Sequence, residues 1–207
     1  MDDRYQGFPD GFFDRSDATE DTHFYSVPRL VTHLDDAAID AVGGLYEELG
    51  LAGPVLDLMS SWVSHFRQPP AELVVLGMNE HELGRNEAAD SIVVQDLNTD
   101  PSLPFADGRF DAVTCCVSVD YLIRPLEVFD EVHRVLRPGG LFVLTFSNRC
   151  FPTKAIRGWL YSDDQGHGAI VAEYFARTGP WSEVEAQVRN RPRHAGDPLY
   201  ALWASAA

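Results

Sequence analysis

Short, almost continuous apolar runs recur through the middle of the chain and alternate with amphipathic stretches. A strand of a parallel sheet is buried on both faces and has this kind of run, whereas an amphipathic helix has apolar residues three and four positions apart. The pattern predicts strands at 55–58, 73–77, 92–95, 110–119 and 141–146, and helices at 60–66, 80–88 and 126–136. We therefore expect a parallel sheet covered by helices on both faces.

The two ends of the chain differ from this alternation. Before the first strand, an apolar helical face is expected to begin after Asp35 or Asp36 and to stop at Gly50, with Ile39, Val42, Leu45, Tyr46 and Leu49 on that face. Helices at 155–161 and 169–177 are followed by strands at 184–188 and 199–204. Because no helix connects these last strands, we expect them to pair antiparallel.

The length of 207 residues fits one α/β domain. We expect an acidic arm at 1–22, either flexible or docked, and one domain at 23–207. The domain is divided into a lid and helix at 23–53, a core at 54–150, and helices with a C-terminal hairpin at 151–207. The arm contains Phe8, Phe12 and Phe13, so its docking on the domain or on a ligand is the alternative to a frayed tail.

Net charge and cysteine content exclude several kinds of partner. Sixteen Lys and Arg residues against 32 Asp and Glu residues give a net charge of −16, which repels nucleic acids and anionic lipid surfaces. Cys115, Cys116 and Cys150 suit neither a disulfide framework nor a structural zinc site. With no signal peptide or membrane-spanning run, we expect a cytoplasmic protein without a metal. The oligomeric state stays open.

Two stretches carry a family resemblance. Residues 103–113 read LPFADGRFDAV and residues 131–140 read EVHRVLRPGG. They resemble the LPFxDxxFDxV and ExxRVLKPGG passages of class I S-adenosylmethionine-dependent methyltransferases of the type 11 kind, and the resemblance covers roughly residues 55–148. It implies a Rossmann-like, doubly wound, mostly parallel α/β sheet of about seven strands with an antiparallel C-terminal hairpin. It also implies S-adenosyl-L-methionine as the cofactor.

In this family the first strand ends in an acid followed by a glycine-rich turn against the methionine end of the cofactor. Asp57 supplies the acid, but the turn Met59, Ser60, Ser61 contains no glycine, and glycine is the residue that tolerates positive φ. Ser60 and Ser61 either donate hydroxyl hydrogen bonds to a cofactor carboxylate or only cap a helix over a closed site. Bulky Met59 or Trp62 would close it.

The ends of the next strands supply the other expected cofactor contacts. Gly77 and Met78 suit a nearby ribose or adenine, while Asn79 stands where the family holds an acid against the ribose hydroxyls. After the third strand, Asp96 corresponds to the acceptor of the adenine amino group and Leu97 packs on the ring. Val117, near the end of the fourth strand, completes the expected cofactor contacts.

Methyl transfer is an in-line displacement, so alignment matters most and a base is needed only for a protonated acceptor. Three candidate catalytic residues are Asp120 and Tyr121, which follow the fourth strand, and His33. Asp120 is a base, an acceptor-orienting carboxylate or a loop cap. His33 lies next to two acids, as a stabilised imidazolium, an oriented base or an exposed residue beside a helix cap.

Acceptor binding is expected from a lid aromatic, Tyr25, and from Asn148, Arg149 and Cys150 after the fifth strand. Arg149 with Lys154 forms either a carboxylate clamp or a pair of ordinary surface cations. The sequence thus predicts an enzyme that methylates a small molecule, with a non-catalytic methyltransferase-fold protein that senses a ligand or binds a partner as the alternative. A nicotinamide dehydrogenase would need a GxGxxG turn, which is absent after the first strand.

Overall fold

The computed structural model describes residues 3–191 and 196–207. One seven-stranded sheet has the order β3-β2-β1-β4-β5-β7-β6. Strands β1 to β5 pair parallel, and β7 pairs antiparallel with both β5 and β6. This arrangement confirms the predicted fold class. The strands are β1 Pro54–Leu58, β2 Glu72–Gly77, β3 Ser91–Val94, β4 Phe110–Cys116, β5 Leu136–Phe146, β6 Glu185–Asn190 and β7 Leu199–Ser205.

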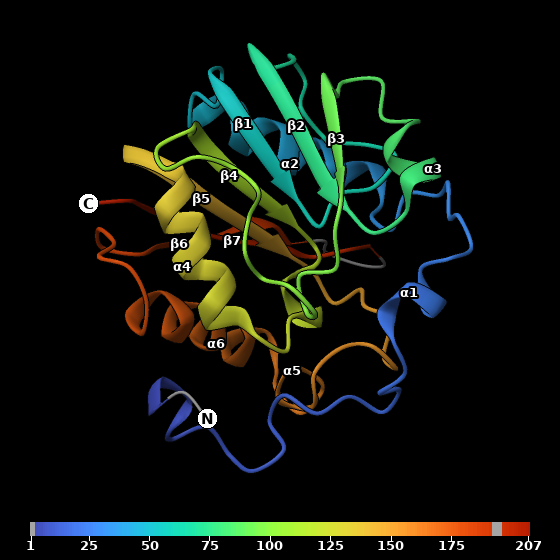
Figure 1. Cartoon of the computed structure of the whole chain (residues 1–207), viewed down its shortest axis with the longest axis vertical. Helices are drawn as coiled ribbons and strands as arrows, with labels where there is room; N and C mark the ends of the chain where they lie inside the picture. Colours follow the sequence, from blue (N-terminus) through green and yellow to red (C-terminus); the bar gives the residue numbers. More distant parts are fainter. Residues whose placement is uncertain (1–2, 192–195) are drawn as a thin grey trace.

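Helices cover both faces of the sheet, with α4 in front of it and α2 behind it in Figure 1. The helices are α1 Asp21–Phe24, α2 Asp36–Glu48, α3 Glu80–Leu83, α4 Pro125–Val135, α5 Arg157–Leu160 and α6 Asp164–Ala176, with short 3-10 helices at Asp3–Tyr5 and Val119–Tyr121. Within the described residues, no helix is long and apolar enough to cross a membrane.

Each face of the sheet has its own apolar cluster. Asp35 caps α2 by accepting a hydrogen bond from the Ala38 N–H, and Val42 and Leu45 of that helix pack on the face that carries Val55. The opposite face packs against α4 and α6, with fully buried residues that include Val113, Phe129 and Phe142. Alternation of side chains along the strands therefore separates the two clusters.

The helix predicted at 60–66 is absent, and an irregular segment connects β1 to β2 instead. Ser60 and Ser64 direct their hydroxyls to the Asp57 carboxylate, and the Ser60 N–H donates to the Leu76 carbonyl. Serine side chains that bond to nearby groups compete with helical hydrogen bonding, which explains the difference. The predicted helix 80–88 is also shortened, because the chain turns at Gly84 and the Asn86 side chain accepts from the Ala88 N–H.

The N-terminal arm is docked, which corresponds to the alternative left open above and differs from a frayed tail. Tyr5, Phe8, Phe12 and Phe13 pack against the cluster that contains Tyr174, with ring centroids 5.0 to 6.4 Å apart. In Figure 1 the arm runs along the lower edge of the molecule, beneath α5, before reaching α1. Its aromatic side chains thus extend the core.

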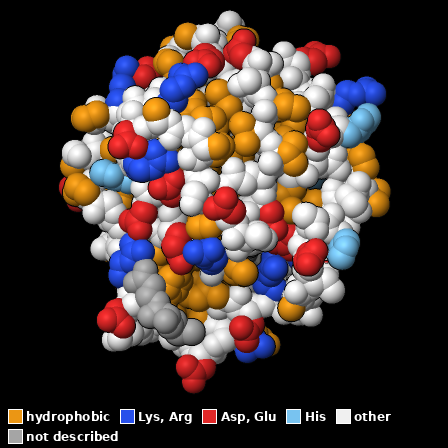
Figure 2. Space-filling view, viewed as in Figure 1, with side chains coloured by type: hydrophobic (Ala, Val, Ile, Leu, Met, Phe, Trp, Pro, Cys, Tyr) orange, Lys and Arg blue, Asp and Glu red, His pale blue; other side chains and the backbone are white. Residues whose placement is uncertain are grey.

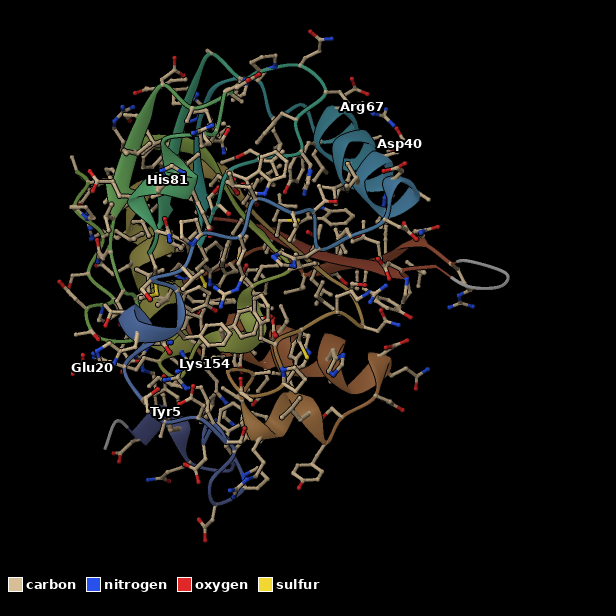
Figure 3. The ribbon with its side chains drawn as sticks, turned by 90° about the vertical axis from the view of Figure 1, so that its right-hand side faces the viewer. Tyr5, Glu20, Asp40, Arg67, His81 and Lys154 are labelled. Atoms are coloured by element: carbon tan, nitrogen blue, oxygen red, sulfur yellow. The ribbon has the colours of Figure 1, made fainter. Side chains whose placement is uncertain are left out.

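Lys154 fixes the end of this arm. Its side chain is fully buried, and its Nζ lies 3.2 Å from Asp17 Oδ2 and 3.1 Å from Asp21 Oδ1. It also donates to the Thr19 carbonyl at 2.8 Å. Figure 3 shows Lys154 beside the arm that Tyr5 marks. The expectation of a carboxylate clamp formed by Lys154 with Arg149 is therefore wrong, because Lys154 already binds carboxylates of the chain itself.

Acidic and basic side chains are interspersed on the face shown in Figure 2, with apolar side chains exposed between them. Many arginines sit against carboxylates: Arg134 with Glu131 and Asp107, and Arg109 with Glu72. With twice as many acids as bases in the chain, a cation without a carboxylate partner is an exception.

Replacing Lys154 with methionine should lower the free energy of unfolding by about 3 kcal/mol, because it leaves the buried Asp21 with one cation fewer. Urea unfolding followed by circular dichroism measures this change. Arg157→Met is the matched control, because the exposed Arg157 lies 3.6 Å from an exposed Asp14 and its loss should change stability by less than about 0.5 kcal/mol. Equal effects of the two substitutions would contradict the buried anchor.

Candidate cofactor and acceptor site

A cavity of about 580 Å³ lies at the carboxyl ends of the parallel strands, where open α/β sheets bind ligands. The ends of β1, β2 and β4 border it, together with residues 95–98 after β3, residues 149–151 after β5, and part of the lid segment, which we define as residues 25–35. Cavities of this size hold small molecules. Met59 and Trp62 line the cavity without filling it, and the Trp62 Nε1–H donates to the Val31 carbonyl of the lid segment.

The Asp57 carboxylate organises the turn after β1. Oδ2 accepts hydrogen bonds from the Ser60 hydroxyl at 2.6 Å and the Ser64 hydroxyl at 2.5 Å, and Oδ1 accepts from the Thr114 hydroxyl of β4 at 2.8 Å. A carboxylate has about four acceptor sites, so only one is left for a ligand. The main role of Asp57 is therefore structural, because its hydrogen bonds hold the turn against β4.

Two residues beside the cavity adopt a backbone conformation that favours glycine. Met59 has φ of 55° and Val117 has φ of 44°, and they follow the adjacent strands β1 and β4. Positive φ is uncommon outside glycine and is strained for a β-branched residue. The turn without glycine thus keeps the conformation that glycine would adopt at Met59. The backbone that approaches this turn most closely is that of Gly77, the last residue of β2, where a Cβ would lie 2.2 Å from the Ser60 carbonyl oxygen.

Two side chains from the region after β2 hold the lid segment. Asn79 caps α3 through its Oδ1, which accepts from the Glu82 N–H, and its Nδ2 donates to the Tyr25 carbonyl at 2.7 Å. The buried Glu82 accepts from the Arg29 N–H at 2.6 Å and from the Ser61 hydroxyl at 2.5 Å. The amide of Asn79 retains one acceptor site and one N–H for a ribose.

The residues after β3 keep the expected adenine contacts accessible. Asp96 accepts from the Asn98 N–H and the Thr99 hydroxyl, which leaves about half of its acceptor capacity. Leu97 is buried in the core beneath it, and both residues line the cavity together with Gly77 and Met78.

Asp120 is buried below the cavity rather than on its wall. Tyr121 lines the cavity, whereas Asp120 is not among its lining residues and is 2% exposed. In the described part of the chain Asp120 Oδ2 has no hydrogen-bond partner. Burial raises the pKa of Asp120 to about 8. A protonated carboxyl is therefore the main form at neutral pH, and a direct role as base would require Asp120 to reach the cavity.

Two imidazoles line the cavity in neutral form. Burial lowers the pKa of His33, and Glu82 opposes this shift only in part. The expected stabilised imidazolium at His33 is thus wrong. The side chain is exposed near the Asp35 cap of α2, as one of the alternatives expected, and its role as an oriented base stays a prediction. Burial also lowers the pKa of His65, which the sequence analysis did not single out because it lay inside a predicted helix.

The loop after β5 places its side chains differently from the expected cluster. Arg149 and Cys150 border the cavity, but Asn148 is exposed and lies outside the lining. Arg149 Nε donates to Asp197 Oδ1 at 2.6 Å, so its charge already has a partner. Asp197 in turn exchanges hydrogen bonds with Asp35 of the lid segment. Sequence reasoning missed Glu82 and Arg29, whose proximity depends on the path of the lid segment.

Comparisons with known proteins agree with this geometry. Residues 58–144 match the model of the methyltransferase domain family. A ubiquinone/menaquinone biosynthesis C-methyltransferase from Dinoroseobacter shibae is 38% identical over 106 residues, which cover 48% of this chain and 42% of that protein. The chain therefore matches less than half the length of this curated relative.

Solved structures share the fold at low identity. An S-adenosylmethionine-dependent methyltransferase from Mesorhizobium loti aligns with a TM-score of 0.55 at 16% identity, covering 81% of this chain and 99% of the other. One from Archaeoglobus fulgidus aligns with a TM-score of 0.56 at 13% identity, covering 81% and 94%. These structures confirm the fold. The family-model match over residues 58–144 and the curated relative confirm the resemblance to class I S-adenosylmethionine-dependent methyltransferases.

Thr114→Val keeps the shape of the side chain but removes one donor from the buried Asp57. We expect a loss of about 1–3 kcal/mol in the free energy of unfolding, because the carboxylate oxygen is left without its partner. Chemical unfolding measures it. Thr19→Val removes a similar hydroxyl bond to Asp17 in an exposed place and should change stability by about 0.5 kcal/mol or less. A neutral Thr114→Val would contradict the organising role of Asp57.

Asp120 gives the protein a pH-dependent stability. Its carboxyl has a pKa of about 8 when folded against 3.8 in the unfolded chain, so the folded state binds the extra proton between these values. Stability is then lost as the pH rises from about 4 to 8. Between pH 5 and pH 8 the wild type should lose about 3 kcal/mol more than Asp120→Asn, measured by urea unfolding at both pH values. Parallel pH profiles would refute the buried protonated carboxyl.

Proposed function

We propose that the protein is a methyltransferase that takes S-adenosyl-L-methionine as cofactor and a small molecule as acceptor. One observation carries the proposal: the cavity beside Asp57 and Asp96 stays open although the turn after β1 contains no glycine. The similarity to methyltransferases over residues 58–144 supports it. No observation favours the non-catalytic alternative.

The charges around the cavity fit a cationic cofactor. The lining of the cavity includes two guanidinium groups, of Arg29 and Arg149, and a larger number of carboxylates. The sulfonium and amino groups of the cofactor are cations, and they are stabilised by this negative surplus. The carboxylates bordering the cavity belong to Asp21, Asp35, Asp57, Glu82, Asp96 and Asp197.

Each end of the cofactor would be held by a different strand end. Asp96 and Leu97 would receive the adenine, and Gly77 to Asn79 would lie along the ribose. The turn at 59–61 would contact the methionine portion, with Val117 facing it from β4. When bound, the cofactor supplies a methyl group on a sulfonium, from which sulfur departs as a neutral thioether.

The protein's part in the transfer is to align the acceptor and to receive its proton. Tyr25 and Tyr121 lie on the cavity wall, and burial raises the pKa of both phenols, so they stay neutral and act as hydrogen-bonding groups. His33 is neutral because burial lowers its pKa, and it would accept the proton of a protonated acceptor. Cys150 would contact the acceptor from the loop after β5.

Calorimetric titration with S-adenosylmethionine and its demethylated product tests the proposal. We expect both to bind, and we expect Asp96→Asn to weaken binding about tenfold, because an amide oxygen replaces a charged acceptor. Asp100→Asn is the matched control, since Asp100 is an exposed acid of the same loop outside the cavity lining. Absence of heat at millimolar ligand in the wild type would end the proposal.

A further inference from the structure

Arg29 is a half-buried cation on the cavity wall that has no carboxylate partner among residues 3–191 and 196–207. Glu82 accepts from the backbone N–H of Arg29, and the guanidinium contacts backbone carbonyls and aromatic rings. A charge removed from water without a counter-ion is unfavourable. The position therefore calls for an anion from outside the chain.

The other buried or cavity-lining cations have internal partners. Arg15 forms two hydrogen bonds with the Asp21 carboxylate at 2.8 and 2.7 Å, and Lys154 contacts the same carboxylate. Arg149 is paired with Asp197. Because the chain has 32 acids and 16 bases, a shortage of carboxylates does not explain why this guanidinium is unpaired. The unpaired cation is thus a specific feature of the cavity.

The guanidinium of Arg29 is held in a fixed place. Its Nη2 donates to the Phe24 carbonyl at 3.0 Å, and its Cζ lies 4.5 Å from the Phe24 ring centroid and 5.3 Å from that of Phe151. A guanidinium has five N–H donors, and the two hydrogen bonds to the Val27 and Phe24 carbonyls leave about three of them free. A planar group with free parallel donors suits a carboxylate.

Aromatic rings surround this cation. The Phe151 ring lies 5.2 Å from His33 and 5.9 Å from Tyr121, and all three border the cavity together with Tyr25. Rings at these separations prefer offset or edge contacts with another ring. The wall near Arg29 therefore suits a planar, unsaturated molecule.

We propose that the methyl acceptor is an aromatic carboxylate whose carboxyl group binds Arg29 and whose ring packs against Phe151 and Tyr121. The inference rests on the proposed methyltransferase function and narrows its acceptor. It replaces the expected clamp of Arg149 with Lys154, because those two cations are already neutralised. The carboxylate of the cofactor's methionine portion is the other group that could bind Arg29. The experiment distinguishes that carboxylate from the one on the acceptor.

The test compares benzoate with its neutral amide, benzamide, by calorimetry and ligand-observed NMR, with and without saturating S-adenosylhomocysteine. The wild type should bind benzoate at least about tenfold more tightly than benzamide. Arg29→Gln should abolish this preference, and Arg29→Lys should keep part of it. Arg85→Gln is the control, because it removes an equal charge from an exposed site outside the cavity and should leave the preference intact.

Affinity for S-adenosylhomocysteine identifies the source of the carboxylate. We expect Arg29→Gln to leave this affinity unchanged within about twofold. A tenfold loss for S-adenosylhomocysteine but not for methylthioadenosine, which has no carboxyl group, would assign Arg29 to the cofactor and overturn the inference. Equal binding of benzoate and benzamide to a wild type that binds the cofactor would also overturn it, while the proposed function stands. Failure of the wild type to bind S-adenosylhomocysteine would instead count against the proposed function.

Discussion

The buried Asp57 carboxylate is the constraint on which the site depends. It lies at the end of a central strand, and hydroxyls from the following turn and from β4 satisfy most of its acceptor sites. A buried charge needs such partners, so the turn is drawn down onto the sheet. The turn then leaves the space above the strand ends open, although the turn itself contains no glycine and is not followed by a helix before β2.

Most of the fold was predictable because it follows from apolar patterning. Each of the seven strands overlaps a predicted strand, although β4 ends at Cys116 rather than at 119 and β5 begins at Leu136 rather than at 141. The strand order obeys the rules for parallel crossovers. The helix expected at 60–66 was wrong, because hydroxyl bonds from Ser60 and Ser64 to Asp57 outweighed a helical spacing. Such bonds leave no periodic signal in a sequence.

The site was predictable mainly where strand ends define it, and two residues of the lid segment, Tyr25 and His33, also line the cavity as expected. Asp57, Asp96 and Tyr121 line one cavity because parallel strands deliver their carboxyl ends to one edge of the sheet. Lys154 and Arg29 were beyond prediction, because their partners come from the arm and the lid, whose paths no local pattern determines. Lys154 thus binds the arm instead of bordering the cavity, and the half-buried Arg29 lies on the cavity wall.

The lid segment is tied to the body at Tyr25, Arg29 and Asp35, the last through paired hydrogen bonds of 2.9 and 2.8 Å with Asp197 just before β7. Because the lid segment is anchored at several points, it opens only when these hydrogen bonds break, either together or one after another. Under the proposed function, a bound cofactor would leave only when the lid segment opens. The hydrogen bonds between Asp35 and Asp197 couple that opening to the residues just before β7.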